Sequence, residues 1–142
     1  MLRLDGPDPD RCAVAALYHD ASEFLTGDLP TPIKYYNPDI KTAYKQVERI
    51  AGERLLDMLP QQLRACYAPL VLEDDAAVLP IVKAADKLSA YVKCVEEQKA
   101  GNTEFDSAAQ QTMASMKAMA LPELDWFIEE CLPAFGLNLD QL

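Results

Sequence analysis

The chain has 142 residues; half of them are hydrophobic and 25% are charged, which is the balance of a globular domain and not of a disordered chain. At this length one domain is the default, so we expect residues 1–142 to form a single domain around one core. Asp and Glu number 23 against 13 Lys and Arg, for a formal net charge of −10. Such an acidic surface repels phosphate backbones, so we expect no nucleic-acid polymer as a partner.

The sequence indicates neither membrane insertion nor secretion. No run approaches the roughly 18 apolar residues that span a bilayer, and the start of the chain lacks the apolar stretch and cleavage site of a signal peptide. The cysteines are far apart and form no Cys-x-x-Cys pair: Cys12, Cys66, Cys94 and Cys131. We therefore expect free, packed thiols in a cytoplasmic protein that has no membrane partner.

Helical signals open the chain. Asp8 followed by Pro9 is typical of a helix start, and we expect a helix from there to about Leu25, ended by Gly27 in a left-handed conformation. Residues 28–38 hold three prolines and must form a loop or irregular turn. The expected apolar stripe of this first helix comprises Ala13, Ala16, Leu17 and Phe24.

Two more helices are expected before the middle of the chain. Asn37 followed by Pro38 repeats the start signal, and a shorter helix is expected after Pro60. Residues 73–75 then form an acidic linker that we expect to be solvated. Apolar positions after Pro38 recur at helical steps of three and four: Ile40, Ala43, Tyr44, Val47, Ile50, Ala51 and Leu55.

The second half continues with helical patterns at about residues 80–100 and 122–132. Thr103 with Asp106 resembles a capping box, which predicts that a further helix, rich in Ala and Met, begins there. We expect Trp126 and Phe127 to anchor the last helix to the core. The expected inward residues of the long helix are Val82, Ala85, Leu88, Val92 and Val95. A methionine stripe is expected in the core or at a dimer interface and comprises Met113, Met116 and Met119. No segment alternates like a strand, so the predicted fold class is all-α.

The single histidine carries most of the chemical information. His19 is followed at once by Asp20, and on a helix Glu23 would lie one turn further along the same face. An imidazole nitrogen beside carboxylate oxygens is a ligand set for a borderline divalent metal such as Zn²⁺. The alternative is a surface or capping pair with no metal, which is the commoner role of a lone His-Asp pair on a helix.

Longer motifs around this pair resemble a known family. The sequence YHDASE at residues 18–23 is followed by LTGDLPTP at residues 25–32, and VKAADKLSAY follows at residues 82–91. Together these motifs resemble the HD-domain phosphohydrolase superfamily and, within it, the bacterial 5′-deoxynucleotidase family. The resemblance covers nearly the whole chain. It implies an all-α HD-domain bundle that releases phosphate from 2′-deoxyribonucleoside 5′-monophosphates.

The resemblance also implies roles for individual residues. His19, Asp20 and Asp86 would bind one divalent metal of the Mn²⁺, Co²⁺ or Zn²⁺ class. Glu23 would lie close to the reactive water and act with Asp28 in catalysis. The residues implied to touch the nucleotide are Asp20, Asp28, Leu29, Pro30, Thr31 and Asp86. Family members commonly pair as homodimers, so a homodimer is a possible assembly.

This sequence departs from the family pattern in one metal ligand. The family uses a further metal-binding histidine on a helix upstream of the HD pair, whereas this sequence holds one histidine in all. We therefore expect an incomplete HD domain that lacks its N-terminal helix or helices, in preference to a degenerate member. Because a ligand is missing, we expect weak nucleotide hydrolysis or none from the chain as given.

Two other functions stay open at the level of sequence. One is a different nucleotide hydrolase of the same superfamily, which the released product (phosphate, pyrophosphate or triphosphate) would distinguish. The other is a non-catalytic helical module that binds a nucleotide or a partner protein. Metal analysis of the purified protein would separate the last from both enzymes, because it predicts no bound metal.

Overall fold

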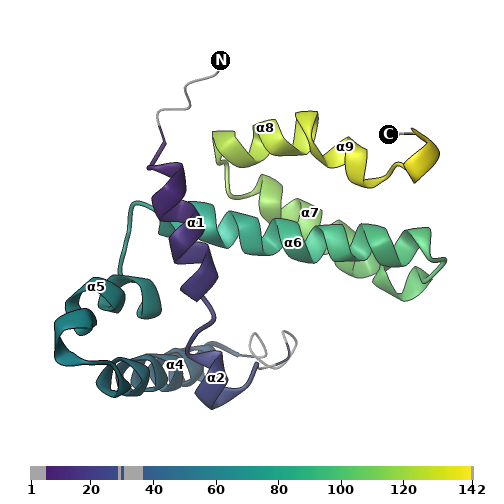
Figure 1. Ribbon diagram of the computed structural model, residues 1–142. Helices are drawn as coiled ribbons and strands as arrows, with labels where there is room; N and C mark the ends of the chain where they lie inside the picture. Colours follow the sequence, from purple (N-terminus) through teal and green to yellow (C-terminus); the bar gives the residue numbers. More distant parts are fainter. Residues whose placement is uncertain (1–5, 29, 31–36, 142) are drawn as a thin grey trace. The chain divides into compact units, whose positions relative to one another are not determined.

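The computed structural model describes residues 6–28, 30 and 37–141, and over these residues the chain is all-α, as the sequence predicts. No strand occurs in this described part. None of its helices is long and apolar enough to cross a membrane. In chain order the helices are α1 (Pro9–Tyr18), α2 (Glu23–Thr26), α4 (Pro38–Met58), α5 (Gln61–Val71), α6 (Leu79–Lys99), α7 (Asp106–Lys117), α8 (Pro122–Glu130) and α9 (Leu132–Phe135), with short 3₁₀ turns η1 (Thr103–Phe105) and η2 (Leu139–Gln141) (Figure 1).

The chain divides into two compact units. The N-terminal unit comprises residues Pro9–Leu79, and the C-terminal unit comprises Pro80–Leu142 together with the leading residues Met1–Asp8. The boundary falls at the first turn of α6, so each unit contains its own set of packed helices. Each is described separately below.

Helices α4 and α5 pack against each other in the N-terminal unit. The Asn37 side chain accepts a hydrogen bond of 2.8 Å from the Ile40 amide and Pro38 follows it, which is the expected helix start. Gly52 of α4 faces the end of α5 closely, since a Cβ there would lie 2.8 Å from Leu72 Cδ2. The buried residues of this unit include Ala51, Leu56 and Val71. A glycine at this point therefore permits close approach of the chain that follows α5.

The expected continuous helix over residues 9–25 is wrong in its second half. It begins at Pro9 as predicted but ends at Tyr18, and α2 starts again at Glu23. The expected apolar stripe is wrong as well, because Leu17 is 81% exposed and Phe24 is 84% exposed, whereas Ala15 is buried. The stripe expected on α4 is also only partly internal: Ala51 is buried, while Val47 and Ile50 are about half exposed.

The acidic segment after α5 is not a purely solvated linker. Asp74 Oδ1 accepts a 2.7 Å hydrogen bond from Arg49 Nη1 of α4, and Asp75 forms an ion pair with Arg11 of α1. The neighbouring Asp74 carboxylate raises the pKa of Arg49 above its ordinary value. The segment thus links two helices of the N-terminal unit by charge.

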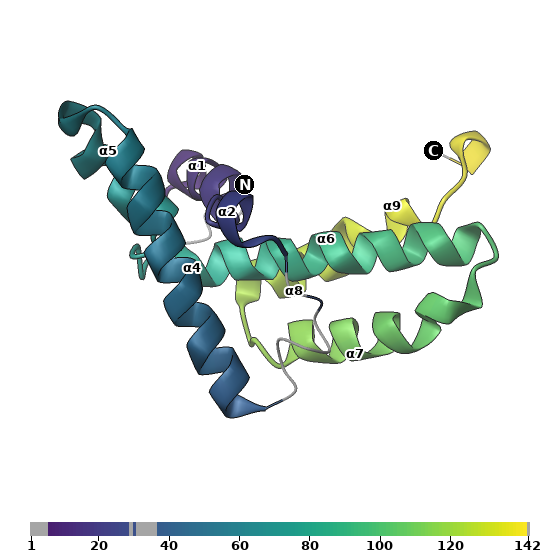
Figure 2. The same ribbon diagram turned by 90° about the horizontal axis from the view of Figure 1, so that it is seen from below.

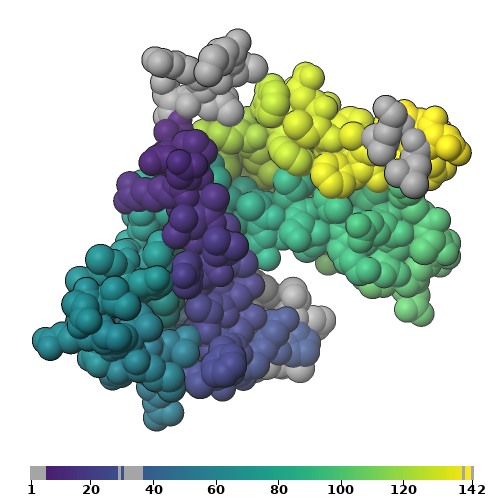
Figure 3. Space-filling model, in the orientation of Figure 1, coloured from purple at the N-terminus to yellow at the C-terminus, as the bar shows by residue number. Residues whose placement is uncertain are grey.

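The C-terminal unit is built on α6. Helix α7 runs back along α6 after the turn at Gly101, which has the positive φ of +84° expected of a helix-ending glycine (Figure 2). Helices α8 and α9 cover another side of α6 (Figure 3). The core is the cluster of Ala84, Met116 and Leu124, with Met116 fully buried. Residues packed against this cluster are Leu88, Tyr91, Met113, Met119, Leu121 and Ile128, so the methionines are core residues as predicted.

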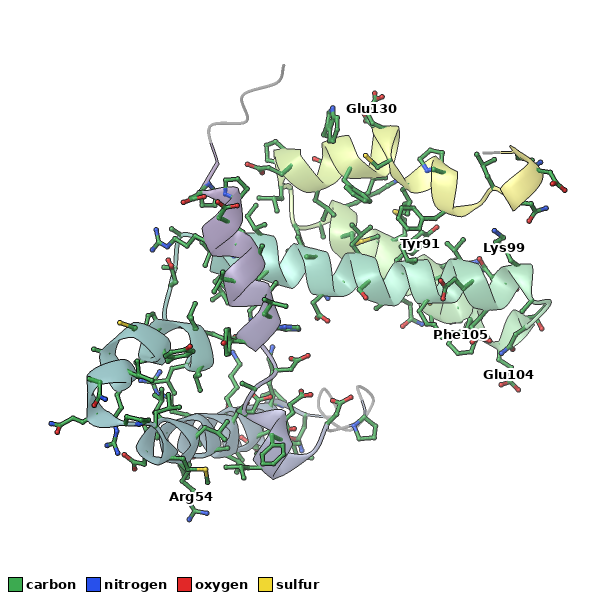
Figure 4. All side chains as sticks on the ribbon, in the orientation of Figure 1. Arg54, Tyr91, Lys99, Glu104, Phe105 and Glu130 are labelled. Atoms are coloured by element: carbon green, nitrogen blue, oxygen red, sulfur yellow. The ribbon has the colours of Figure 1, made fainter. Side chains whose placement is uncertain are left out.

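Side-chain directions on the surface of this unit can be followed in Figure 4. Tyr91 points from α6 toward the α8–α9 segment, while Glu130 points away from it. At the last turn of α6, Lys99 Nζ donates hydrogen bonds to the backbone carbonyls of Leu137 at 2.6 Å and Phe135 at 3.5 Å. The side chain of Lys99 therefore fastens the segment after α9 to the end of α6.

Several local expectations for this unit are corrected. Asn102, and not Thr103, caps the helical segment, because its side chain accepts from the Glu104 amide at 3.2 Å. Asp106 begins α7 and accepts from Gln98 Nε2 at 2.8 Å. Trp126 is 40% exposed and does not anchor α8; Leu124 does, at 4% exposure. Likewise Ala84 is buried where Ala85 was expected. Helix α8 ends at Glu130, before the expected bound near residue 132, and Pro133 lies inside α9.

Candidate functional site

The HD pair lies in the tight turn that joins α1 to α2. Residues 19–22 are not helical. The Ala21 amide donates to the Tyr18 carbonyl at 2.9 Å, and the Glu23 amide donates to the Asp20 carbonyl at 3.0 Å. Both bonds span three residues, whereas an α-helix uses four. This tightening places His19 and Asp20 where the chain changes direction.

The His19 ring is held on both sides. Its Nδ1 lies 2.7 Å from the Ala16 carbonyl oxygen, which accepts from the ring N–H, and its Nε2 lies 2.9 Å from Asp20 Oδ2. The bond from Nδ1 to a carbonyl fixes the orientation of the ring and turns Nε2 toward the Asp20 carboxylate. The His19 side chain is 26% exposed and that of Asp20 is 56% exposed. The ring is therefore oriented by the backbone. Part of each side chain is exposed, but the His19 Nε2 atom itself is buried.

The two candidate catalytic acids bracket α2. Glu23 is the first residue of this helix and is half-buried, and Asp28 is exposed just beyond its end. Gly27 ends the helix with φ 71° and ψ 161°, and its amide donates to the Glu23 carbonyl at 2.8 Å. Short local hydrogen bonds therefore connect the HD turn, Glu23 and Asp28 along one stretch of chain.

The remaining predicted contact residues are distributed differently. Pro30 is described and exposed, whereas Leu29 and Thr31 lie outside the described residues. Asp86 lies on α6 in the C-terminal unit, on the exposed side of that helix next to Lys87. Within either unit, over the described residues, no group of three or more His, Cys, Asp and Glu side chains is arranged to hold a metal ion. The structure thus brings His19 and Asp20 together, and the participation of Asp86 stays a prediction.

A tyrosine pair beside the HD turn was not anticipated from the sequence. The rings of Tyr18 and Tyr67 meet edge to face with centroids 5.6 Å apart. Their hydrogen bond raises the pKa of the Tyr18 phenol above its ordinary value, and charge interaction between the two groups and burial act in the same direction. Tyr67 lies on α5, and helical periodicity does not identify the partner of a side chain on another helix. The contact ties the last residue of α1 to α5.

Comparison with known proteins agrees with this arrangement of motifs. The family described as 5′-deoxynucleotidase YfbR-like matches residues 4–135. A 5′-deoxynucleotidase of Erwinia tasmaniensis is 49% identical over 137 residues, which cover 95% of this chain and 69% of the relative. A 5′-deoxynucleotidase of Shewanella oneidensis is 44% identical, covering 95% of this chain and 70% of the relative.

The 5′-deoxynucleotidase YfbR of Escherichia coli is 48% identical over 137 residues, 94% of this chain and 68% of the relative. Both HD-type motifs lie inside the matched region, since it includes residues 18–32 and 82–91. The chain is therefore a member of the YfbR-like 5′-deoxynucleotidase family.

Proposed function

We propose that this chain is a metal-dependent phosphomonoester hydrolase that converts 2′-deoxyribonucleoside 5′-monophosphates to deoxynucleosides and phosphate. Family membership supports the reaction class. The observation that carries the proposal on the chain itself is the His19 ring, whose Nδ1 bonds the Ala16 carbonyl and whose Nε2 lies beside the Asp20 carboxylate. That geometry is typical of a histidine prepared to bind a cation through Nε2.

The proposed cofactor is a divalent metal of the Mn²⁺, Co²⁺ or Zn²⁺ class. What supports it is the chemistry of the donor set, because one imidazole nitrogen, His19 Nε2, lies 2.9 Å from one carboxylate oxygen, Asp20 Oδ2. Asp86 would be the third ligand, as the family resemblance implies, and residues 1–142 would belong to a single HD domain. A metal bound there supplies acidity to a coordinated water and offsets charge on the phosphoryl oxygens.

The side chains around the turn have distinct tasks in this proposal. Glu23 accepts a proton from the attacking water, since it is half-buried one short turn from Asp20. Asp28, exposed at the end of α2, meets the sugar or the leaving 5′-oxygen. The stretch from Asp28 to Thr31, with Asp20 and Asp86, would form the nucleotide-binding surface.

Two further parts of the proposal concern assembly and location. A homodimer is consistent with the apolar side chains that the N-terminal unit leaves exposed, among them Leu17 and Phe24. A reducing cytoplasm is consistent with four free cysteines. Sedimentation of the purified protein measures the first, and fractionation of the source cells measures the second.

The decisive test is phosphate release from 2′-deoxyadenosine 5′-monophosphate with added Mn²⁺ or Co²⁺. We expect weak phosphate release or none, because one histidine leaves three ligands and even the loss of a supporting residue weakens metal sites about 10–100-fold. Asp86→Ala should abolish any metal-dependent phosphate release. Asp125 is an exposed acid on α8, and Asp125→Ala should leave that release unchanged.

The outcomes separate the alternatives. Release of pyrophosphate or triphosphate from longer nucleotides would indicate another hydrolase of the superfamily. Absence of bound metal together with intact nucleotide binding would indicate a non-catalytic module. Activity that survives Asp86→Ala would show that the proposed ligand set is wrong.

A further inference from the structure

The carbonyl of Gly27 receives two hydroxyl groups. Tyr44 Oη donates to it at 2.8 Å from α4, and Thr26 Oγ1 donates to it at 3.0 Å from the preceding residue. Tyr44 is 17 residues away in sequence, so this is a tertiary contact between α4 and the end of α2. Tyr44 belongs to the apolar repeat of α4, yet its hydroxyl is directed to a backbone acceptor.

The backbone conformation at Gly27 and its hydrogen bonds together fix the direction of the chain at this residue. With φ 71° and ψ 161° the residue lies near a conformation that only glycine adopts readily. Its amide donates to Glu23 and its carbonyl accepts from Tyr44, so the peptide groups on both sides of the residue are fixed. Asp28 is the next residue, and its starting direction is set by these two bonds.

Two described residues that precede α4 in sequence both contact this helix. The Asn37 side chain caps α4 through the Ile40 amide at 2.8 Å. The Gly27 carbonyl accepts from Tyr44 in the second turn of the same helix. Helix α4 therefore supports the peptide group that precedes Asp28.

We propose that Tyr44 is a positioning residue for Asp28: its hydroxyl fixes the Gly27 carbonyl and thereby the direction in which the Asp28 carboxylate meets the nucleotide. The inference rests on the proposed function, which gives Asp28 its role. A hydrogen bond as exposed as this one contributes little to folding. Its loss should therefore change the nucleotide interaction more than the stability.

Tyr44→Phe tests the inference because it keeps the ring and removes only the donor. Amide hydrogen exchange of the peptide covering residues 23–28 should become faster, with an unchanged unfolding midpoint. Thr42→Val is the matched control, because it removes a hydroxyl of the same helix that donates to the Pro38 carbonyl at 2.9 Å and does not touch Gly27. Exchange that stays unchanged in Tyr44→Phe would overturn the anchoring role.

The functional arm uses 2′-deoxyadenosine 5′-monophosphate with Mn²⁺. Tyr44→Phe should weaken its binding, or kcat/KM, by about three- to tenfold, the effect expected for one lost hydrogen bond. In the Asp28→Asn background the same substitution should have no further effect, because the group that it positions is gone. Equal effects of Tyr44→Phe in both backgrounds would show a general structural role and overturn the inference.

Failure of the proposed function has a different signature. If the unaltered chain neither binds nor hydrolyses the nucleotide, the proposed function and the positioning role fall together. If the unaltered chain is active and Tyr44→Phe matches it in kcat/KM, only the inference about Tyr44 falls.

Discussion

Replacing Gly27 with alanine should destabilise the N-terminal unit through backbone strain. Nothing lies within 4 Å of the Cβ that alanine would add, so there is no steric clash. The cost is the backbone alone, because φ 71° with ψ 161° is close to a region that side chains with a Cβ avoid. Asparagine, which tolerates the left-handed helical region, should be no better here because that region needs a ψ near +45°.

The magnitude follows from two opposing effects. Backbone strain of this kind costs about 1–3 kcal/mol, and alanine restricts the unfolded chain by about 0.4–1 kcal/mol in the opposite direction, so the central values leave about 1.3 kcal/mol.

Denaturant unfolding of Gly27→Ala, Gly27→Asn and Gly136→Ala measures this. Gly136 is the matched control, because its φ of −78° suits any residue and its added Cβ would meet only the Pro133 carbonyl at 3.4 Å. We expect the two Gly27 variants to be destabilised alike and Gly136→Ala to be near neutral. A Gly27→Ala variant as stable as Gly136→Ala would refute the reasoning from backbone strain.

Two further predictions concern the C-terminal unit. Met116→Ala should lower the free energy of unfolding by about 2–5 kcal/mol, because Met116 is fully buried. Met58 is 69% exposed, so Met58→Ala should lower it far less. Similar losses in the two variants would contradict the assigned core. Hydrogen bonds from Lys93 and then Asn102 lower the pKa of Glu97 below its ordinary 4.5. Because the folded pKa is depressed, this contribution to stability is present above pH 4.5 and is lost as the pH falls through the lowered pKa. Glu97→Gln should flatten that part of the acid-unfolding curve, and an unchanged curve would count against the linkage.

Helix starts and stops were largely predictable because they depend on local chemistry. Proline lacks an amide hydrogen and suits the first turn, as at Pro9, Pro38 and Pro122. Glycine accepts positive φ, as at Gly27 and Gly101. The break after Tyr18 was missed, because the Ala16 carbonyl that would serve a continuing helix accepts from the His19 ring, and apolar periodicity carries no information about that bond.

In the candidate site too, some features follow from the sequence and others only from the tertiary structure. Sequence alone identified His19, Asp20, Glu23 and Asp28 by motif. Neighbouring side chains can point in different directions, so the 2.9 Å approach of His19 Nε2 to Asp20 Oδ2 depends on the turn that the structure shows. Only the tertiary structure decided which hydroxyl holds the Gly27 carbonyl, and which arginines meet Asp74 and Asp75. It also decided that Leu17 and Phe24 face outward. Conformational preference belongs to a residue and its immediate neighbours, whereas burial and long-range pairing depend on what packing brings alongside, and no local pattern contains that information.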